Sequence, residues 1–237
     1  MTSTTETRHN RAKDGELALQ ARDLCFRWAA SQPIIRFPDL TIPRGEHLFL
    51  QGASGSGKST LLSLLSGMQV PHSGSVSVLG SELQHLGSGP RDRFRADHVG
   101  VIFQQFNLVP YLSALANVTL PCRLSRVRLE QTRPNPDSAA EELLRMLAIP
   151  EDHWHRKVTR LSIGQQQRIA AARALMGSPG IILADEPTSA LDSDNRDRFL
   201  DLLLGLADER GASVVFVSHD RSLSHHFHHQ VHLGDES

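Results

Sequence analysis

The sequence lacks the features that mark several other classes of protein. It has 237 residues but two cysteines, Cys25 and Cys122, far apart and without metal-ligand spacing, so reduced thiols are expected rather than a disulfide framework. No apolar run approaches the ~18 residues of a membrane span, and the polar residues 1–16 contain no signal-peptide core. A net charge of -1 supplies no basic field to attract nucleic acid or anionic lipid. We therefore expect a soluble, intracellular protein that reaches membranes only through a partner.

A glycine-rich stretch at residues 52–60 is the clearest motif in the chain, and it fits Gly-x-x-x-x-Gly-Lys-[Ser/Thr]. The apolar residues 48–50 predict a buried strand before it, and the spacing over 61–68 predicts a helix after it. In that context backbone N–H groups and the helix N-terminus point at a phosphate, Lys58 reaches the β/γ-phosphates and Ser59 binds Mg²⁺. A plain glycine turn is the alternative, which both flanks disfavour. The residues expected at the phosphates are Gly52, Ala53, Ser54, Gly55, Ser56, Gly57, Lys58, Ser59 and Thr60.

Apolar segments elsewhere predict an α/β chain that also contains an antiparallel β region and an inserted helical subdomain. Short apolar segments between residues 17 and 42, broken by prolines, predict an antiparallel region. A helical pattern over 112–160 interrupts the later α/β alternation and predicts an inserted subdomain. The remaining predicted elements are strands at 99–103, 181–184 and 213–217 and helices at 165–176 and 199–206.

Local signals predict where several elements begin and end. The Gly-Ser-Gly-Pro run at 87–90 predicts a loop. Ser138 followed by Glu141 fits a capping box, and the apolar residues after it predict one buried helix face. The polar segment 126–137, with two prolines, predicts an exposed connection. Residues 1–16 predict a disordered tail.

The histidine-rich run at 225–232 has two interpretations. His225 and His229 are spaced i, i+4, which would suit a metal ion on a helix. No cysteine or carboxylate completes a convincing ligand set, so we favour an exposed last helix.

Four further stretches accompany the phosphate loop in chain order. They are Phe-Gln-Gln at 103–105, Leu-Ser-Ile-Gly-Gln-Gln-Gln-Arg at 161–168, an apolar strand ending in Asp-Glu-Pro-Thr-Ser-Ala-Leu-Asp at 181–192, and Val-Ser-His-Asp at 217–220. With the loop, they make residues 17–234 resemble the nucleotide-binding subunits of ABC transporters. The signature stretch at 161–165 separates that family from other phosphate-loop ATPases. The resemblance implies an α/β phosphate-loop NTPase domain with an antiparallel β subdomain and a helical subdomain over 105–165.

A closer resemblance rests on residues 103–110 and 116–121. They look like the lipoprotein-releasing, macrolide-export and cell-division ABC ATPases. This implies a cytoplasmic ATPase that a permease holds at the inner face of the cell membrane. It would dimerise on ATP and drive that permease, exporting or extracting a lipoprotein, peptide or hydrophobic compound. The alternative is a regulatory ATPase that signals through a membrane partner without transport. A role in translation or DNA repair is disfavoured, because those proteins usually carry tandem cassettes or coiled coils.

Two carboxylates after one predicted strand supply the expected chemistry. Asp185 would reach the edge of the sheet and, with Ser59, hold Mg²⁺. Its alternative is a helix N-cap before Pro187. Glu186 is the expected general base for the attacking water.

Three more residues take their expected roles from the resemblance. Gln104 looks like the lid glutamine that contacts Mg²⁺ or water, and His219 like the switch histidine that touches the γ-phosphate. Trp28 is expected to stack on adenine, because the family places an aromatic residue upstream of the phosphate loop. An aromatic residue in the core is the alternative, and it also fits Phe26.

The signature stretch implies a second copy of the chain. Ser162, Gly164 and Gln165 would bind the γ-phosphate held by that copy, and residues 189–192 would connect the two sites, giving a C₂ homodimer. Ile163 stands where the family commonly has glycine. Because a β-branched residue at positive φ is costly, we expect a negative φ there and retained activity.

Overall fold

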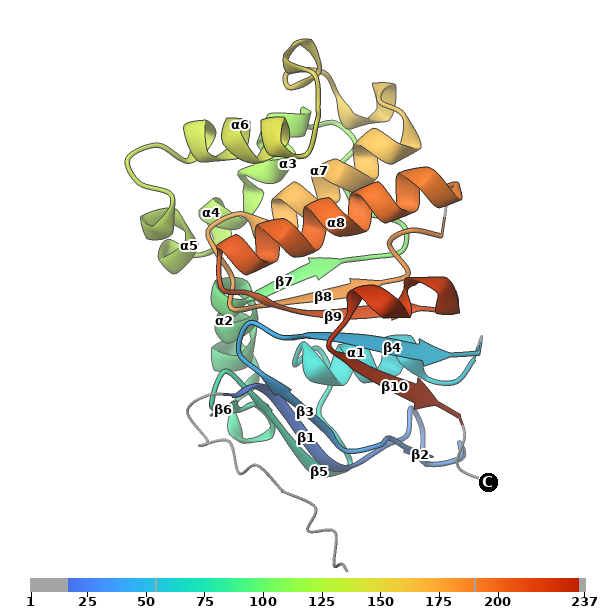
Figure 1. The fold of residues 1–237 in the computed structure, drawn as a ribbon. Helices are drawn as coiled ribbons and strands as arrows, with labels where there is room; N and C mark the ends of the chain where they lie inside the picture. The colour runs from blue at the N-terminus through green and yellow to red at the C-terminus, as the bar shows by residue number, and fades with distance from the viewer. Residues whose placement is uncertain (1–16, 54, 190, 235–237) are drawn as a thin grey trace, which may run out of the picture.

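Two sheets organise the computed structural model, which describes residues 17–53, 55–189 and 191–234 (Figure 1). The central sheet is parallel, in the order β10-β4-β9-β8-β7. Its strands are β4 (His47–Gly52), β7 (Val99–Ile102), β8 (Ile181–Asp185), β9 (Ser213–Ser218) and β10 (His229–Leu233). Because these strands run in one direction, the loops that follow them leave from a single edge, which is where ligands bind in open α/β sheets.

The second sheet is antiparallel and lies below the first in Figure 1. Its central strand β1 pairs with three others, and the last of these pairs onward with β6. The strands are β1 (Leu17–Phe26), β2 (Ile35–Arg36), β3 (Leu40–Pro43), β5 (Ser73–Val78) and β6 (Ser81–Glu82). The antiparallel region predicted from the proline-broken segments is confirmed.

Buried side chains form one cluster on each face of the parallel sheet, because successive strand residues point to opposite faces. Phe49 and Phe216 face α7 (Ile163–Leu175) and α8 (Ser193–Glu209). On the other face, α1 (Lys58–Leu65) and the antiparallel sheet cover a cluster that includes Leu48, Leu50, Leu183, Val215 and Val217. Burial on both faces explains why these strands are apolar without alternation.

A group of short helices covers the upper side of the molecule beside α7 (Figure 1). These are α3 (Ala114–Val118), α4 (Leu120–Leu124), α5 (Arg126–Gln131) and α6 (Pro136–Met146). The apolar face predicted for α6 is buried, with Ala140, Leu143 and Leu144 at 2% exposure or less. In the described ranges, no helix is both long and apolar enough to cross a bilayer.

Two predicted boundaries are wrong because prolines begin helices here. The capping box at Ser138 is not used, since Asn135 caps α6 and its Oδ1 accepts from the N–H of Asp137 at 3.0 Å. The predicted loop at 87–90 is instead the start of α2 (Ser88–His98), with Gly87 as the N-cap. A proline in the first turn removes an N–H that has no partner within the helix.

Two further predictions fail because polar residues have tertiary partners. The predicted exposed connection at 126–137 contains α5, and its Arg128 is buried at 2% exposure. The expected last helix is only a short 3₁₀ turn, Arg221–His226, followed by the edge strand β10 on β4. The alternation of His229, Val231 and Leu233 with other residues is a strand pattern that the histidines obscure.

Candidate active site

Residues from four distant stretches meet in a cleft of about 720 Å³ at the carboxyl edge of the parallel sheet. The phosphate loop follows β4, Gln104 follows β7, Asp185 ends β8 and His219 follows β9. The cleft is lined by Trp28, Ile35, Gly55, Gly57, Lys58, Ser59, Thr60, Gln104, Asp185, Glu186, Ser189 and His219. Most of the predicted nucleotide residues therefore share one cavity, while Ser54 lies outside the described residues.

The phosphate loop owes its shape to glycines in the left-handed region. Gly55 has φ 83° and Gly57 has φ 91°, and α1 begins directly after Gly57. A Cβ on Gly57 would also stand 3.2 Å from Cε1 of Phe37, so the loop needs glycine there for space as well. The amide N–H groups of the first turn of α1 have no partners within the helix and face the cleft.

Lys58 is held at the base of the cleft. Its side chain is almost fully buried, and Nζ donates to the carbonyl oxygens of Gly52 at 2.8 Å and Ala53 at 2.9 Å. The same Nζ lies 3.5 Å from Oε1 of Glu186. The ammonium is thus positioned beside both the loop and the end of β8.

Ser59 and Asp185, the two residues predicted to hold Mg²⁺ through oxygen atoms, lie in direct contact. The Ser59 hydroxyl donates to Oδ2 of Asp185 at 2.8 Å. Burial raises the pKa of Asp185, as does the charge of Glu186, while the Ser59 hydrogen bond and Lys58 oppose the rise. A hydroxyl beside a partly desolvated carboxylate fits Mg²⁺, which takes few protein oxygens and keeps several waters. Gln104 lines the same cleft.

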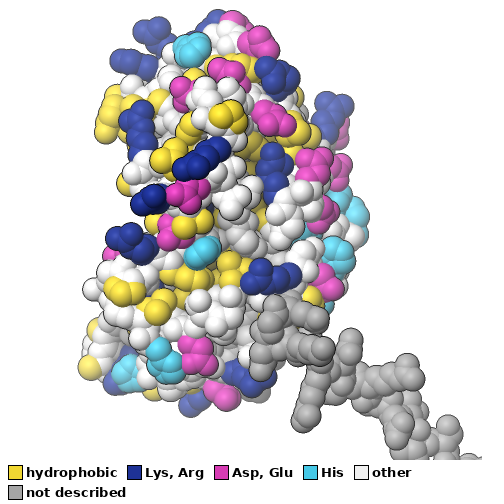
Figure 2. Space-filling model, turned by 90° about the vertical axis from the view of Figure 1, so that its left-hand side faces the viewer, with side chains coloured by type: hydrophobic (Ala, Val, Ile, Leu, Met, Phe, Trp, Pro, Cys, Tyr) yellow, Lys and Arg dark blue, Asp and Glu magenta, His cyan; other side chains and the backbone are white. Residues whose placement is uncertain are grey.

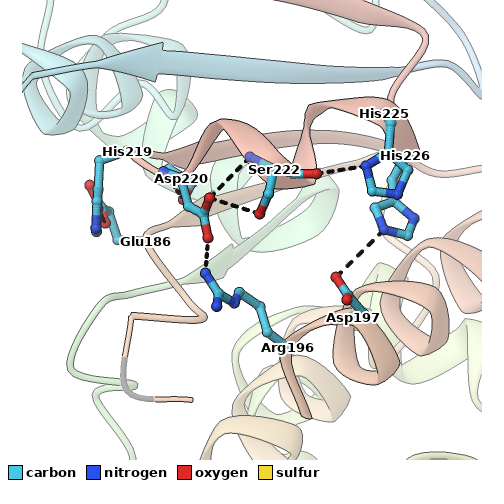
Figure 3. A network of polar contacts seen from close by, with 9 residues as sticks. Glu186, Arg196, Asp197, His219, Asp220, Ser222, His225 and His226 are labelled. Carbon is cyan, nitrogen blue, oxygen red and sulfur yellow. Dashed lines mark hydrogen bonds and ion pairs between the residues drawn. The ribbon is translucent and has the colours of Figure 1, made fainter. Parts of the chain in front are cut away.

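Glu186 lies beside His219 (Figure 3) and also faces Lys58. Its Oε2 is 2.5 Å from Nδ1 of His219, while Oε1 faces Lys58. The Glu186 side chain is 13% exposed and its φ is 46°, a left-handed value that is uncommon for a residue with a Cβ. Its backbone N–H donates to the carbonyl of Val217 at 3.0 Å, which extends the pairing of β8 with β9 by one residue. The carboxylate is therefore fixed by its backbone as well as by its side-chain contacts.

Trp28 lies at the mouth of the cleft and is not a core residue. It is 57% exposed, whereas Phe26 is buried at 6%. The two rings meet edge-to-face, with centroids 5.1 Å apart and planes at 89°. This support leaves much of the indole surface available for stacking on a planar ring.

The signature residues lie elsewhere, around a separate hollow of about 380 Å³. Ser162 caps α7 through a two-way capping box: its Oγ accepts from the N–H of Gln165 at 3.3 Å, and Oε1 of Gln165 accepts from the N–H of Ser162 at 3.1 Å. Ile163 is the first residue of α7, is 56% exposed, and is not among the positive-φ residues. Ser162 and Gly164 line the hollow but not the Lys58 cleft, so one chain does not bring the two predicted sets together.

Comparison with known proteins assigns the chain to a family. The family described as "ABC transporter" matches residues 36–189. The chain belongs to the ABC transporter family. Within it, the chain is an ATP-binding subunit of the ATPase type, related to the lipoprotein- and macrolide-export group.

Three relatives illustrate the similarity of this ABC ATPase to known proteins. The uncharacterised ABC transporter ATP-binding protein YbbA of Escherichia coli is 42% identical over 186 residues, 78% of this chain and 79% of its own. MJ0796 of Methanocaldococcus jannaschii is 40% identical over 197 residues, 83% of each chain. The macrolide export ATP-binding/permease protein MacB of Rhodopseudomonas palustris is 41% identical over 201 residues, 85% of this chain but 30% of MacB.

A solved structure supports the α/β fold predicted for this ABC ATPase. The dimeric, post-hydrolysis structure of the MJ0796 cassette bound to ADP and Pi superposes with a TM-score of 0.79 at 34% identity, covering 92% of this chain and 94% of that one. The fold class, with its parallel core, antiparallel sheet and helical region, is confirmed.

One contact of this ABC ATPase that the sequence motifs do not predict is the ion pair between Asp220 and Arg196. Asp220 follows His219, and its Oδ1 accepts from the N–H and Oγ of Ser222 at 3.0 and 2.8 Å (Figure 3). Its Oδ2 pairs with the guanidinium of Arg196 in the first turns of α8. The pair ties the His219 segment to the helix that follows residues 189–192. No local spacing could reveal two residues so far apart in sequence.

The histidine-rich end of the ABC ATPase has individual partners. His229 pairs with Glu46, His226 faces Asp197 and Asp201, and His225 contacts the carbonyl of Ser222. In the part of the chain that the structure describes, no three His, Cys, Asp or Glu side chains are grouped to hold a metal ion.

Proposed function

We propose that this chain hydrolyses ATP in the Lys58 cleft as half of a head-to-tail homodimer, and that dimer closure drives a membrane permease. The observation that carries the proposal is the position of Glu186, between Lys58 and His219 and next to the Ser59–Asp185 pair. These are the groups that phosphoryl transfer to water requires: a cation, a metal site and a base.

Binding would use groups that are already in place. Lys58 exchanges the carbonyls of Gly52 and Ala53 for phosphate oxygens, and Trp28 stacks on the adenine. Ser59 and Asp185, with Gln104, would hold Mg²⁺, which neutralises charge on the phosphates. Lys58 and the α1 amides stabilise the charge that remains.

Glu186 would orient the attacking water and accept its proton. A general base must lie within hydrogen-bond reach of that proton, and the cleft leads directly to the carboxylate. His219 holds Oε2 at 2.5 Å, which leaves Oε1 and the nearby Lys58 facing the phosphate end. His219 would thereby align the base and contact the γ-phosphate.

A second copy is needed to complete the site. The first-turn amides of Ile163 and Gly164 in α7 have no partners within the helix, so this end attracts an anion. Within one chain that end lies at a separate hollow from the Lys58 cleft. Ser162, Gly164 and Gln165 would thus meet the phosphates of the partner copy. MJ0796, solved as a dimer, supports this arrangement.

A groove on the left-hand face of Figure 1 is where we place the permease contact. It has a volume of about 360 Å³ and lies between residues 103–107, α2 and α4. Figure 2 shows this face, with hydrophobic side chains gathered at mid-height among basic and acidic ones. Phe103 and Asn107 line this groove and lie near Gln104 in the chain, and Gln104 lines the nucleotide cleft. A movement of Gln104 on nucleotide binding would therefore shift the residues that contact a segment docked in the groove. The groove supports attachment at the inner face of the membrane through a permease. The relation to the lipoprotein- and macrolide-export group supports export or extraction of a lipoprotein, peptide or hydrophobic compound.

The decisive experiment replaces the base without changing its shape. Glu186→Gln should abolish ATP turnover, because an amide cannot accept the proton of water, while ATP binding persists and the dimer accumulates. ATPase assays and light scattering with ATP measure both effects. Glu209→Gln, an exposed change in α8, is the matched control and should turn over normally. Near wild-type hydrolysis by Glu186→Gln would show that Glu186 is not the base.

A further inference from the structure

His153 lies outside every sequence motif but contacts the signature segment. It ends a short 3₁₀ turn, Glu151–His153, and its side chain is 20% exposed. Its Nδ1 is 2.9 Å from Nε2 of Gln165 in the first turn of α7. Gln165 therefore connects this turn to the capping box at the start of α7.

Hydrogen-bond chemistry fixes the role of each atom in this contact. Oε1 of Gln165 accepts from the backbone N–H of Ser162, so Nε2 is the end that faces His153. An amide nitrogen only donates, and Nδ1 must therefore be an unprotonated acceptor. The ring proton then sits on Nε2, which lies 3.6 Å from Oδ2 of Asp152. Asp152 in turn pairs with Arg156. Of the two contacts of the ring, the one with Gln165 is within hydrogen-bond distance, and it determines which ring nitrogen accepts.

The contact determines what the end of α7 offers to a ligand. With its amide held, Gln165 keeps Oε1 on the N–H of Ser162 and its own N–H on the Ser162 Oγ. The Ser162 hydroxyl thus accepts within the chain, and its proton remains free to be donated outward. Beside it, the Ile163 and Gly164 amides have no helical acceptor. Three donors are therefore available at the N-terminus of α7.

We infer that His153 is a positioning residue for the trans phosphate site: its Nδ1 locks the Gln165 amide and so presets the Ser162 hydroxyl and first-turn amides for the phosphate of a second copy. This rests on the proposed ATP-driven dimer. His153 acts through Gln165 and touches no nucleotide itself.

The first test needs no dimer. His153→Phe keeps a ring but removes the acceptor, whereas His153→Asn places an oxygen acceptor close to the position of Nδ1. In the nucleotide-free monomer, amide exchange at Ser162 measured by NMR should be roughly fivefold faster in His153→Phe, the effect of one lost hydrogen bond. It should return to the wild-type rate in His153→Asn. Equal exchange in all three proteins would overturn the inference.

The second test measures dimerisation in the Glu186→Gln background by light scattering over a range of protein concentrations with ATP. His153→Phe should weaken the dimer about 25-fold, since each dimer contains two contacts worth about fivefold each. ATP affinity of the monomer should stay unchanged, and the melting temperature should fall by no more than about 4 °C, the effect of one lost hydrogen bond in a chain of this length. His153→Asn should restore dimerisation. Loss in His153→Asn but not in His153→Phe would mean that the ring matters only for packing and would refute the inference. Equal loss in both variants would show that an acceptor at the position of Nδ1 does not restore the dimer, and would refute it as well. If the Glu186→Gln parent itself stays monomeric, the proposed dimer fails instead, and the exchange experiment still decides the role of His153.

Discussion

Glu186 combines an unusual backbone with an unusual set of neighbours. A residue with a Cβ at positive φ costs on the order of 1–3 kcal/mol, so such a conformation persists where surrounding bonds enforce it. Here the N–H of Glu186 is held by Val217 and its carbonyl accepts from Ser189 at 3.2 Å. The strain turns the carboxylate out of the line of β8 toward Lys58. The two successive carboxylates thus take different places, Asp185 beside Ser59 and Glu186 beside His219.

His47 is a buried histidine that carries a pH-dependent part of the stability. Its Nδ1 accepts from the N–H of Val214 at 3.2 Å, and its Nε2 lies 3.0 Å from Oδ1 of Asp208, so the neutral ring satisfies both partners. Burial lowers the pKa of His47 from the ordinary 6.5; Asp208 opposes this and His228 adds to it. As pH falls below 6.5, His47 binds a proton in the unfolded chain before it does in the folded chain, so the free energy of unfolding decreases.

We therefore predict that His47 steepens the acid side of the stability curve. The free energy of unfolding should fall between pH 6.5 and 5 by up to about 1.4 kcal/mol per pH unit from this group alone. His47→Asn should flatten that slope, measured by urea unfolding at several pH values. His85→Asn, at an exposed histidine, should leave it unchanged. Parallel curves for wild type and His47→Asn would contradict the prediction.

Residue roles could be predicted only where a motif is local in the sequence. The phosphate loop, Asp185 and Glu186 each follow an apolar strand, so their meeting at one edge was expected. Trp28 was ambiguous, because exposure is a tertiary property. His153 and Arg196 gave no signal, since each depends on a partner in another element.

At the scale of elements, Arg128 connects the helical region to the parallel sheet. From α5, its guanidinium donates to Val99 at 2.7 Å, Met176 at 2.9 Å and Ala174 at 3.4 Å. The first of these carbonyls begins β7, and the other two lie at the C-terminal end of α7. Burial lowers the pKa of Arg128 to about 10, while Cys122 and Asp97 oppose the shift, so the side chain stays charged at neutral pH.

We predict that Arg128→Met destabilises the protein by about 3 kcal/mol, because three carbonyls lose a charged donor and are left buried. Arg126→Met removes an 88% exposed arginine from the same helix and should change stability by less than about 0.5 kcal/mol. Urea unfolding at pH 7 measures both. A loss below about 1 kcal/mol for Arg128→Met would mean that water replaces the guanidinium at little cost.

Elements were predictable where apolar periodicity was strong and unpredictable where polar residues were buried. β8 and β9 are apolar on both faces, so the sequence marks them plainly. α5 looked like a connection because its buried residue is an arginine. β10 is hard to recognise because two of its five residues are histidines. His229 lies on the same face as Val231 and Leu233, so a polar residue begins its apolar alternation.

At the scale of the whole molecule, the site lies at the edge of the parallel sheet while the signature hollow lies beside α7 and α8. The site and the hollow belong to one packed unit, because buried side chains cover both faces of the parallel sheet. The chain therefore presents a donor-rich helix end and a phosphate cleft as separate surfaces. A second copy that supplied each surface to the other would satisfy both, which sequence spacing alone could not indicate.

The groove on the left-hand face leads to a prediction about the permease. Leu124 lines it and is 73% exposed, so its side chain is available to a docked segment. Leu124→Glu would place a charge against any apolar segment docked there. Retention of a membrane permease should fall about 100-fold or more, since an unpaired buried charge costs about 3 kcal/mol or more. ATP binding and turnover by the isolated chain should not change, since Leu124 does not line the nucleotide cleft.

The measurement is co-purification of the tagged chain with its native membranes, with the retained permease identified and quantified by mass spectrometry. Leu129→Glu is the matched control, because Leu129 is also exposed, at 42%, but does not line the groove. Loss of the permease with Leu124→Glu and not with Leu129→Glu would assign the contact to the groove. Because the groove adjoins Gln104 through Phe103, Leu124→Glu should also remove any stimulation of ATPase activity by the permease. Equal retention of the permease by both variants would show that it docks on another surface of the chain.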